Sequence, residues 1–112
     1  MGYGSKSISD YMTEAHRIAS DHGWWDEPEW SFPEKVALMH SELSEALEEW
    51  RDGKPLSYVA EGKPEGVAIE FADVLIRIFD TSEKMGIDLE QAVRVKMEYN
   101  RSRPYRHGGK KA

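Results

Sequence analysis

The stretch from Val67 to Phe79 (VAIEFADVLIRIF) constrains the fold of this chain most, because it is almost wholly apolar and yet carries two acids. On a helical wheel the charged residues of this region fall in one stripe less than about a quarter-turn wide, and apolar residues fill the remainder. The stripe consists of Glu70, Asp73, Arg77 and Asp80. A helix with so wide an apolar surface packs on more than one side, and in a short chain a second subunit can supply part of that packing. We therefore expect a helical protein that forms a homo-oligomer.

Helical periodicity, interrupted by Gly and Pro, predicts the rest of the fold. We expect four helices, over residues 9–22, 32–51, 65–84 and 89–102. Two of them have N-terminal capping signatures, in which Ser31 precedes Glu34 and Asp88 precedes Gln91 by three residues. No segment shows the alternating pattern of a strand. The sequence therefore predicts an all-α, four-helix-bundle-like chain.

Length and composition indicate one domain over residues 1–112, with flexible tails at 1–8 and 104–112. The chain has no Cys, no secretory signal and no apolar run near the roughly 20 residues of a membrane span, so we expect a cytoplasmic protein. The net charge is −6, but the last twelve residues carry five Lys or Arg and no acid, which leaves −11 on residues 1–100. Such an acidic body argues against nucleic acid as the main ligand and suits the binding of cations.

Two pairs of acids lie on successive predicted helices. Glu42 and Glu45 are three residues apart on the second helix, and Glu70 and Asp73 have the same spacing on the third, so each pair projects from one helix face. Antiparallel packing with these faces opposed would bring four carboxylates together, and they would repel one another in a partly desolvated site. A hard divalent cation removes this repulsion, because Mg²⁺ and Mn²⁺ prefer oxygen ligands.

Each pair is also typical of a solvated helix face when it is considered alone. In that interpretation Asp73 forms an ion pair with Arg77, four residues further along the same helix. Both pairs occur on successive helices, with a Gly- and Pro-containing loop between them. This combination favours a metal site about as much as a solvated face. On the residues alone, both interpretations stay open.

At these acids the sequence resembles the MazG-like all-α nucleoside triphosphate pyrophosphatases, whose signature is EExxE on one helix and ExxD on the next. SELSE matches at Glu42 and Glu45, and EFAD matches at Glu70 and Asp73, whereas Ser41 stands where the family has its first Glu. The segment KMEYNRSRPYRHGGK resembles the family's K-x-x-x-N segment and the RP-x-x-HGGK tail of small MazG-like proteins. The resemblance covers roughly residues 33–110.

The resemblance implies a homodimer or homotetramer that hydrolyses a (deoxy)nucleoside triphosphate to the monophosphate and pyrophosphate, in nucleotide-pool housekeeping. It implies Mg²⁺, with Mn²⁺ as a substitute, held by four carboxylates: Glu42, Glu45, Glu70 and Asp73. A triphosphate approaches so acidic a cleft only with the cation between them, and the cation lowers the pKa of a bound water. Glu45, or a neighbouring acid, would orient that water or accept its proton.

The substrate phosphates also need positive partners. The resemblance implies substrate contacts for Lys96 and Asn100, one turn apart on the fourth helix, and for Arg103 after it. A surface face without ligand is the alternative for this segment. Arg77, one turn after Asp73, is a further candidate that would contact phosphate or only neutralise Asp73.

Tryptophans are the candidates for binding the base. Trp24 and Trp25 lie in the loop before the second helix, and their faces suit the stacking of any base. The same residues also suit a lid over the core or an interface. Trp50, at the apolar edge of the second helix, is predicted to lie in the core.

Two other classes of function remain compatible with this sequence. One is a protein that binds a nucleotide or a metal without turnover, for which Ser41 is the hint. The other is a helical interaction module, in which the acids are only a solvated face. In all three cases we expect neither a membrane nor a nucleic acid as partner.

Overall fold

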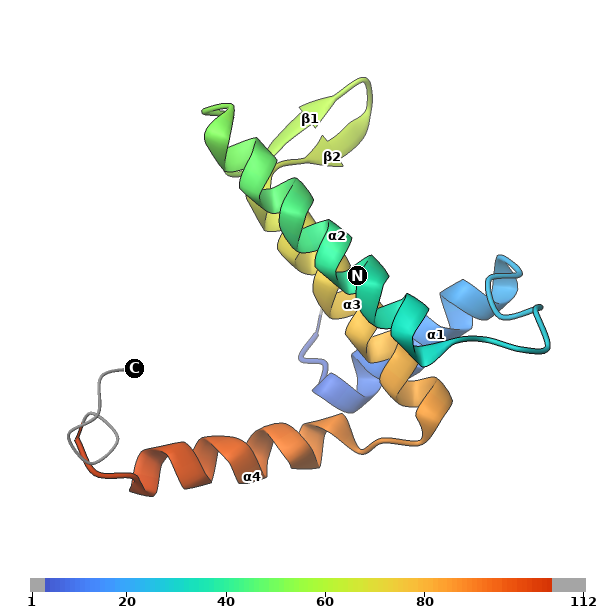
Figure 1. Ribbon diagram of the computed structural model, residues 1–112, viewed down its shortest axis with the longest axis vertical. Helices are drawn as coiled ribbons and strands as arrows, with labels where there is room; N and C mark the ends of the chain where they lie inside the picture. The colour runs from blue at the N-terminus through green and yellow to red at the C-terminus, as the bar shows by residue number, and fades with distance from the viewer. Residues whose placement is uncertain (1–3, 106–112) are drawn as a thin grey trace.

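The computed structural model describes residues 4–105, in which helices predominate (Figure 1). The elements in chain order are α1 (Ile8–Asp21), α2 (Phe32–Arg51), β1 (Tyr58–Ala60), β2 (Lys63–Glu65), α3 (Val67–Met85) and α4 (Leu89–Ser102). The predicted helical class is thus confirmed. Helix α1 begins inside the predicted N-terminal tail, and residues 1–3 and 106–112 of the two expected tails lie outside the described residues.

The helices begin where side chains can satisfy free backbone N–H groups. At α2 the Ser31 hydroxyl accepts a hydrogen bond from the Glu34 backbone N–H, and at α4 a carboxylate oxygen of Asp88 accepts one from Gln91. Both predicted caps are confirmed. Helix α1 has a full capping box formed by Ser7 and Asp10, which explains why it starts slightly earlier than expected.

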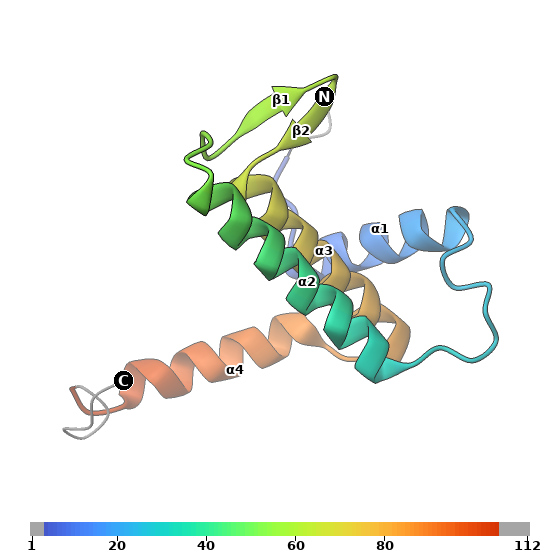
Figure 2. The same cartoon turned by 45° about the horizontal axis from the view of Figure 1, so that its top comes forward.

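Helices α2 and α3 lie side by side and antiparallel, and α1 packs across α3 (Figures 1 and 2). Helix α4 extends away from this group, so the four helices of one chain do not close into a bundle. Its first turn is attached to the start of α1, where Glu90 Oε1 accepts a hydrogen bond from the Ser9 backbone N–H at 3.1 Å. The rest of α4 therefore has little support from its own chain.

A β-hairpin joins α2 to α3, so the prediction that no segment forms a strand is wrong. Strands β1 and β2 are antiparallel, with Tyr58 opposite Glu65 and Ala60 opposite Lys63. The two residues that connect them, Glu61 and Gly62, have φ of 53° and 78°. Positive φ at both central positions is the geometry of the tight hairpin turns that Asn-Gly and Asp-Gly favour. Glu-Gly is a weaker signal for the same turn, and β2 occupies the start of the helix predicted from residue 65.

Gly66 fixes the junction between the hairpin and α3. Its φ is 113°, and a Cβ at this position would lie 2.5 Å from the Leu56 carbonyl oxygen. That oxygen accepts a hydrogen bond from the Ala68 backbone N–H at 3.0 Å. Because no side chain caps α3, this close approach of the preceding chain provides an acceptor in the first turn of the helix.

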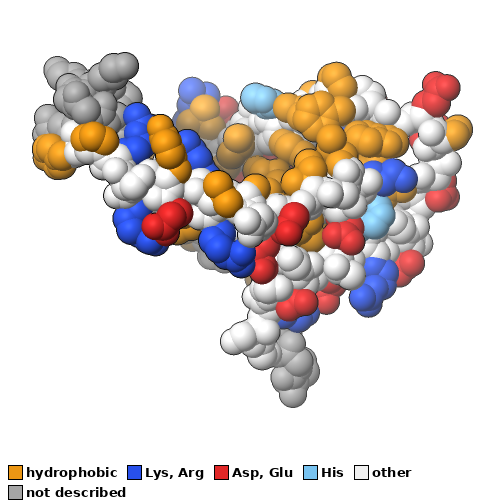
Figure 3. Space-filling view, turned by 90° about the horizontal axis from the view of Figure 1, so that it is seen from below, with side chains coloured by type: hydrophobic (Ala, Val, Ile, Leu, Met, Phe, Trp, Pro, Cys, Tyr) orange, Lys and Arg blue, Asp and Glu red, His pale blue; other side chains and the backbone are white. Residues whose placement is uncertain are grey.

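The core is small and lies mainly between α1 and α3. Among residues 4–105 the buried apolar residues are Met12, Ala15, Ala19 and Ala46. The apolar stripe of α2 is largely uncovered: Leu43 and Leu47 are about half exposed, and Trp50 is 68% exposed, so its predicted place in the core is wrong for this chain. Figure 3 shows hydrophobic side chains spread over the end of the molecule opposite the hairpin. None of the described helices combines the length and hydropathy needed to cross a membrane.

We predict that Gly66→Ala lowers the free energy of unfolding by about 2 to 4 kcal/mol, because the added methyl group meets the Leu56 oxygen as well as an unfavourable φ. Gly62→Ala is the matched control, since its φ is also positive but nothing lies within 4 Å of the added Cβ; we expect it to cost about 1 kcal/mol. Chemical denaturation followed by circular dichroism measures both. Equal losses would show that the close approach at Gly66 does not stabilise the fold.

Candidate metal centre

Three of the four predicted metal ligands meet between α2 and α3. One carboxylate oxygen each from Glu42, Glu45 and Glu70 lies within 4.8 Å of the others. Glu42 and Glu45 project from one face of α2, and the antiparallel packing places Glu70 of α3 opposite them. Asp73 lies outside this group, although it follows Glu70 by three residues and lines the adjoining cavity.

The pKa values of these acids are shifted by burial and by their closeness to one another. Burial raises the pKa of Glu70 to about 8, with further increases from the contact with Glu45 and from the charges of Glu42 and Asp73. Burial and the contact with Glu45 also raise the pKa of Glu42. The pKa of Glu45 is lowered, because Glu70 and Glu42 act as hydrogen-bond donors to it. At neutral pH Glu70 therefore retains a proton that an ordinary glutamate releases.

Arg77 forms an ion pair with the acid cluster. Its Nε and one terminal nitrogen both lie 3.0 Å from Oε1 of Glu42. Among the described residues Arg77 forms its salt bridge with Glu42, and not with Asp73 as in the solvated-face alternative. The guanidinium offsets part of the desolvation of Glu42, which is 8% exposed, and its charge also helps to lower the pKa of Glu45.

The cluster has the donor set that a hard cation prefers. All three ligand candidates are carboxylates, which suit Mg²⁺ and Mn²⁺. Oε2 of Glu70 is buried and has no hydrogen-bond partner among the described residues. An unpaired buried carboxylate oxygen is costly unless a proton or a cation compensates it. The residues present therefore fit a divalent cation bound by Glu42, Glu45 and Glu70.

A cavity of about 830 Å³ adjoins the cluster. Glu42, Asp73 and Arg77 line the side next to the acid cluster. The remaining wall is mainly apolar and comes mostly from α1 and α3, with Lys6, Glu14 and Asp80 as its other charged residues. The apolar lining residues are Ile8, Tyr11, Ala15, Ile18, Ala19, Trp24, Ala72, Leu75, Ile76 and Phe79. Because Glu42 belongs to both the cluster and the cavity wall, a molecule in the cavity reaches the acids directly.

The two candidate tryptophans lie in different surroundings. Trp24 is 60% exposed and lines the cavity, where its ring is available to a ligand. The Trp25 indole nitrogen donates a hydrogen bond to Asp80 Oδ1 at 2.8 Å, and His16 Nδ1 lies 2.8 Å from the same oxygen. The Lys35 ammonium lies 4.1 Å from the centre of a Trp25 ring. Trp25 thus fastens the loop to α1 and α3, and only Trp24 borders the cavity.

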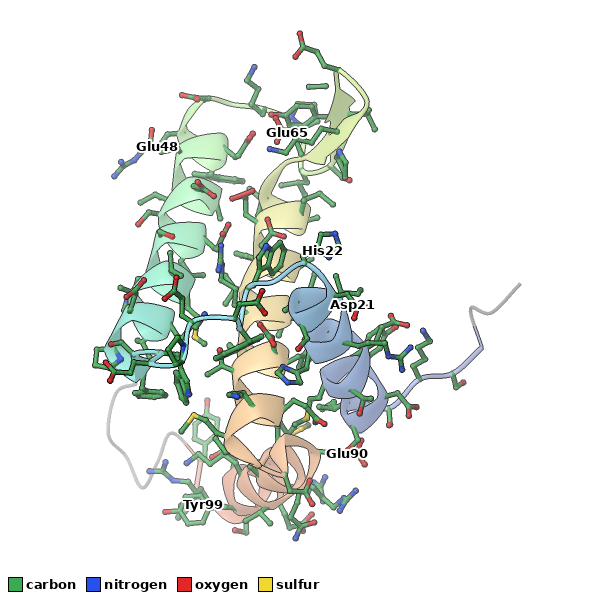
Figure 4. The ribbon with its side chains drawn as sticks, turned by 90° about the vertical axis from the view of Figure 1, so that its right-hand side faces the viewer. Asp21, His22, Glu48, Glu65, Glu90 and Tyr99 are labelled. Carbon is green, nitrogen blue, oxygen red and sulfur yellow. The ribbon has the colours of Figure 1, made fainter. Side chains whose placement is uncertain are left out.

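The structure does not bring the α4 candidates to the acid cluster within one chain. The Lys96 ammonium lies 4.8 Å from the centre of the Tyr99 ring, and Arg103 lies 5.5 Å from it. Figure 4 places Tyr99 at the opposite end of the molecule from Glu65 of the hairpin. Asn100 belongs to the same outer part of α4, where its side chain is exposed. A role for these residues at the cluster requires the α4 of another subunit.

The hairpin places a basic side chain, Lys63, near the acid cluster, which was not predicted from the sequence. The charges of Lys63 and Arg77 both lower the pKa of Glu45, which means that Lys63 of β2 lies within electrostatic range of the cluster. The hairpin is held to α2 by Tyr58, whose hydroxyl contacts both carboxylate oxygens of Glu49 at 2.9 and 2.8 Å. This contact raises the pKa of Tyr58 to about 12. The only sequence signal for this arrangement was the Glu-Gly turn.

Comparison of this chain with protein-family models, with curated proteins and with solved structures found no match. The site is therefore defined by its geometry and by the sequence motifs at its acids.

We predict that the stability of the metal-free protein falls as the pH rises from about 5 to about 8, because a group whose pKa is raised by folding stabilises the fold only while it is protonated. Glu70→Gln, which mimics the protonated acid, should remove part of this loss, so the variant gains about 1 to 2 kcal/mol over the wild type across that range. Urea denaturation at several pH values measures the difference. Parallel stability curves for the two proteins would mean that Glu70 titrates as an ordinary glutamate.

Proposed function

We propose that this protein is a Mg²⁺-dependent nucleoside triphosphate pyrophosphohydrolase that converts a (deoxy)nucleoside triphosphate and water to the monophosphate and pyrophosphate. The convergence of Glu42, Glu45 and Glu70 beside a mainly apolar cavity is the observation that carries the proposal. The resemblance of the same acids to the MazG-like signature supports it. Mn²⁺ is the expected substitute cation, because it accepts the same oxygen ligands.

The acids have different roles in this proposal. Glu42, Glu45 and Glu70 would hold the cation, and Asp73 borders the cavity from the next turn of α3. The cation supplies the charge that joins the acids to a polyphosphate and makes an attacking water more acidic. Glu45 is the candidate general base, since it belongs to the acid cluster and is ionised at neutral pH. Attack at the α-phosphorus then breaks its bond to the bridging oxygen and releases pyrophosphate.

The cavity suits the nucleoside part of the substrate. Its apolar wall offers burial for a base, and the Trp24 ring offers a stacking surface. Its polar side places the Arg77 guanidinium and the Asp73 carboxylate next to the acid cluster. A nucleotide with its base in the cavity therefore has its phosphates directed at Glu42 and the cation.

We predict that the purified protein with Mg²⁺ releases pyrophosphate from at least one member of a panel of ribo- and deoxyribonucleoside triphosphates. Glu45→Gln should lower kcat by about 100-fold or more while the helical content is retained. Glu48→Gln is the matched control on the same helix, because the Glu48 carboxylate pairs with Arg51 and points away from α3 (Figure 4). Binding of a non-hydrolysable analogue without any turnover would instead indicate a nucleotide sensor.

A homo-oligomer, dimeric or tetrameric, is part of the proposal. Leu43, Leu47 and Trp50 form an apolar stripe on α2 at helical spacing, and each is about half or more exposed. On α4, Val95, Met97 and Tyr99 are likewise more than half exposed. Exposed apolar stripes of this kind favour a subunit interface, and a second chain would also give α4 the support that its own chain lacks.

We predict that the wild-type protein elutes as a dimer or tetramer and that Leu47→Glu shifts it to the monomer, because the new carboxylate would be desolvated at the interface. Ser20→Glu adds the same charge at an exposed position of α1 and should leave the assembly unchanged. Size-exclusion chromatography with light scattering measures the masses. A wild-type monomer at high concentration would contradict this part of the proposal.

A further inference from the structure

The proposed reaction needs a basic side chain to bind the substrate phosphates. Most candidate side chains are already paired with an acid or lie far from the acid cluster. The Arg77 guanidinium is paired with Glu42 at 3.0 Å. Lys96 and Arg103 lie against Tyr99 on α4, at the far end of the molecule from the hairpin. Lys63 is different, because its side chain is 77% exposed and its ion pair among the described residues, with Glu65 Oε1, is 3.7 Å long. A contact this long and exposed leaves the ammonium available to a stronger anion.

The register of the hairpin determines which way Lys63 faces. Cross-strand partners share a face, and so do residues two apart on one strand. Tyr58, Ala60, Lys63 and Glu65 therefore lie on the same face of the hairpin. Because the Tyr58 hydroxyl reaches Glu49 of α2, this face is the one turned toward the acidic helices. Val59, on the opposite face, is 71% exposed.

The hairpin is also held in place firmly enough to position a ligand. Its first strand is tied to α2 through both oxygens of Glu49, which lies one helical turn after Glu45. Its second strand leads through Gly66 into the first turn of α3, where the Leu56 carbonyl accepts the Ala68 N–H. The two attachments lie on the two helices that carry the acids.

We infer that Lys63 is a substrate-binding residue that contacts the phosphates of the proposed substrate from the hairpin side of the acid cluster. The inference rests on the proposed function and deepens it by naming the group that binds the pyrophosphate part. A lysine ammonium is a compact charge suited to phosphate oxygens, and its bonds to them are strengthened by charge. The acids and the cation then face the triphosphate from one side, and Lys63 faces it from another.

The test compares Lys63→Met, Lys63→Arg and the matched control Lys54→Met, which removes an exposed lysine from the loop before the hairpin. Calorimetry with Mn²⁺ alone measures the metal centre, and calorimetry with pyrophosphate in the presence of Mg²⁺ measures phosphate binding. We expect Lys63→Met to weaken pyrophosphate binding about tenfold, as the loss of a charge-assisted hydrogen bond does. Mn²⁺ affinity should stay the same or increase, and Lys63→Arg should retain most of the pyrophosphate affinity.

The outcomes separate this inference from the function on which it rests. Equal pyrophosphate affinity in Lys63→Met and the wild type, with Mn²⁺ binding intact, would overturn the role of Lys63 and leave the pyrophosphohydrolase proposal standing. An equal loss in Lys54→Met would also overturn it, because general charge and not position would then explain the effect. A wild-type protein that binds no Mn²⁺ and hydrolyses no triphosphate would overturn both.

Discussion

The enforced proximity of three glutamates between α2 and α3 is the constraint on which the proposed function depends. Antiparallel packing of two helices with acids at i,i+3 brings Glu42, Glu45 and Glu70 together, and burial then makes their full ionisation unfavourable. Either a retained proton or a bound cation reduces the repulsion among these carboxylates. In the proposed function a cation would replace the proton, and a polyphosphate would be the second ligand of that cation.

Much of the helical framework was predictable from the sequence, because caps and apolar periodicity are local. Ser31 and Asp88 were recognised as caps from short-range patterns that need no tertiary information. The meeting of the two acid pairs followed from their spacing, although Asp73 lies outside the group that the packing forms. The partner of Arg77 was not predictable, because the choice between Asp73 on its own helix and Glu42 on the next depends on how closely α2 and α3 approach.

The hairpin and the uncovered apolar surface show where sequence reasoning failed. A two-residue turn with Glu61 in place of Asn or Asp gives a weak hairpin signal, and three-residue strands are too short for alternation to be seen. Trp50 was assigned to the core because periodicity identifies an apolar face without saying which chain covers it. Both failures concern what a segment packs against, which is a property of the assembled molecule and not of the segment.

The carboxylate of Asp80 connects the loop before α2 and helix α1 to α3. A single oxygen of this residue binds the indole of Trp25 in the loop and the imidazole of His16 on α1, while Asp80 itself belongs to α3 and to the cavity wall. Helix α1 and the loop that contains Trp25 therefore both contact the same atom, Asp80 Oδ1. A ligand that displaced this loop would therefore also disturb the contact of α1 with α3.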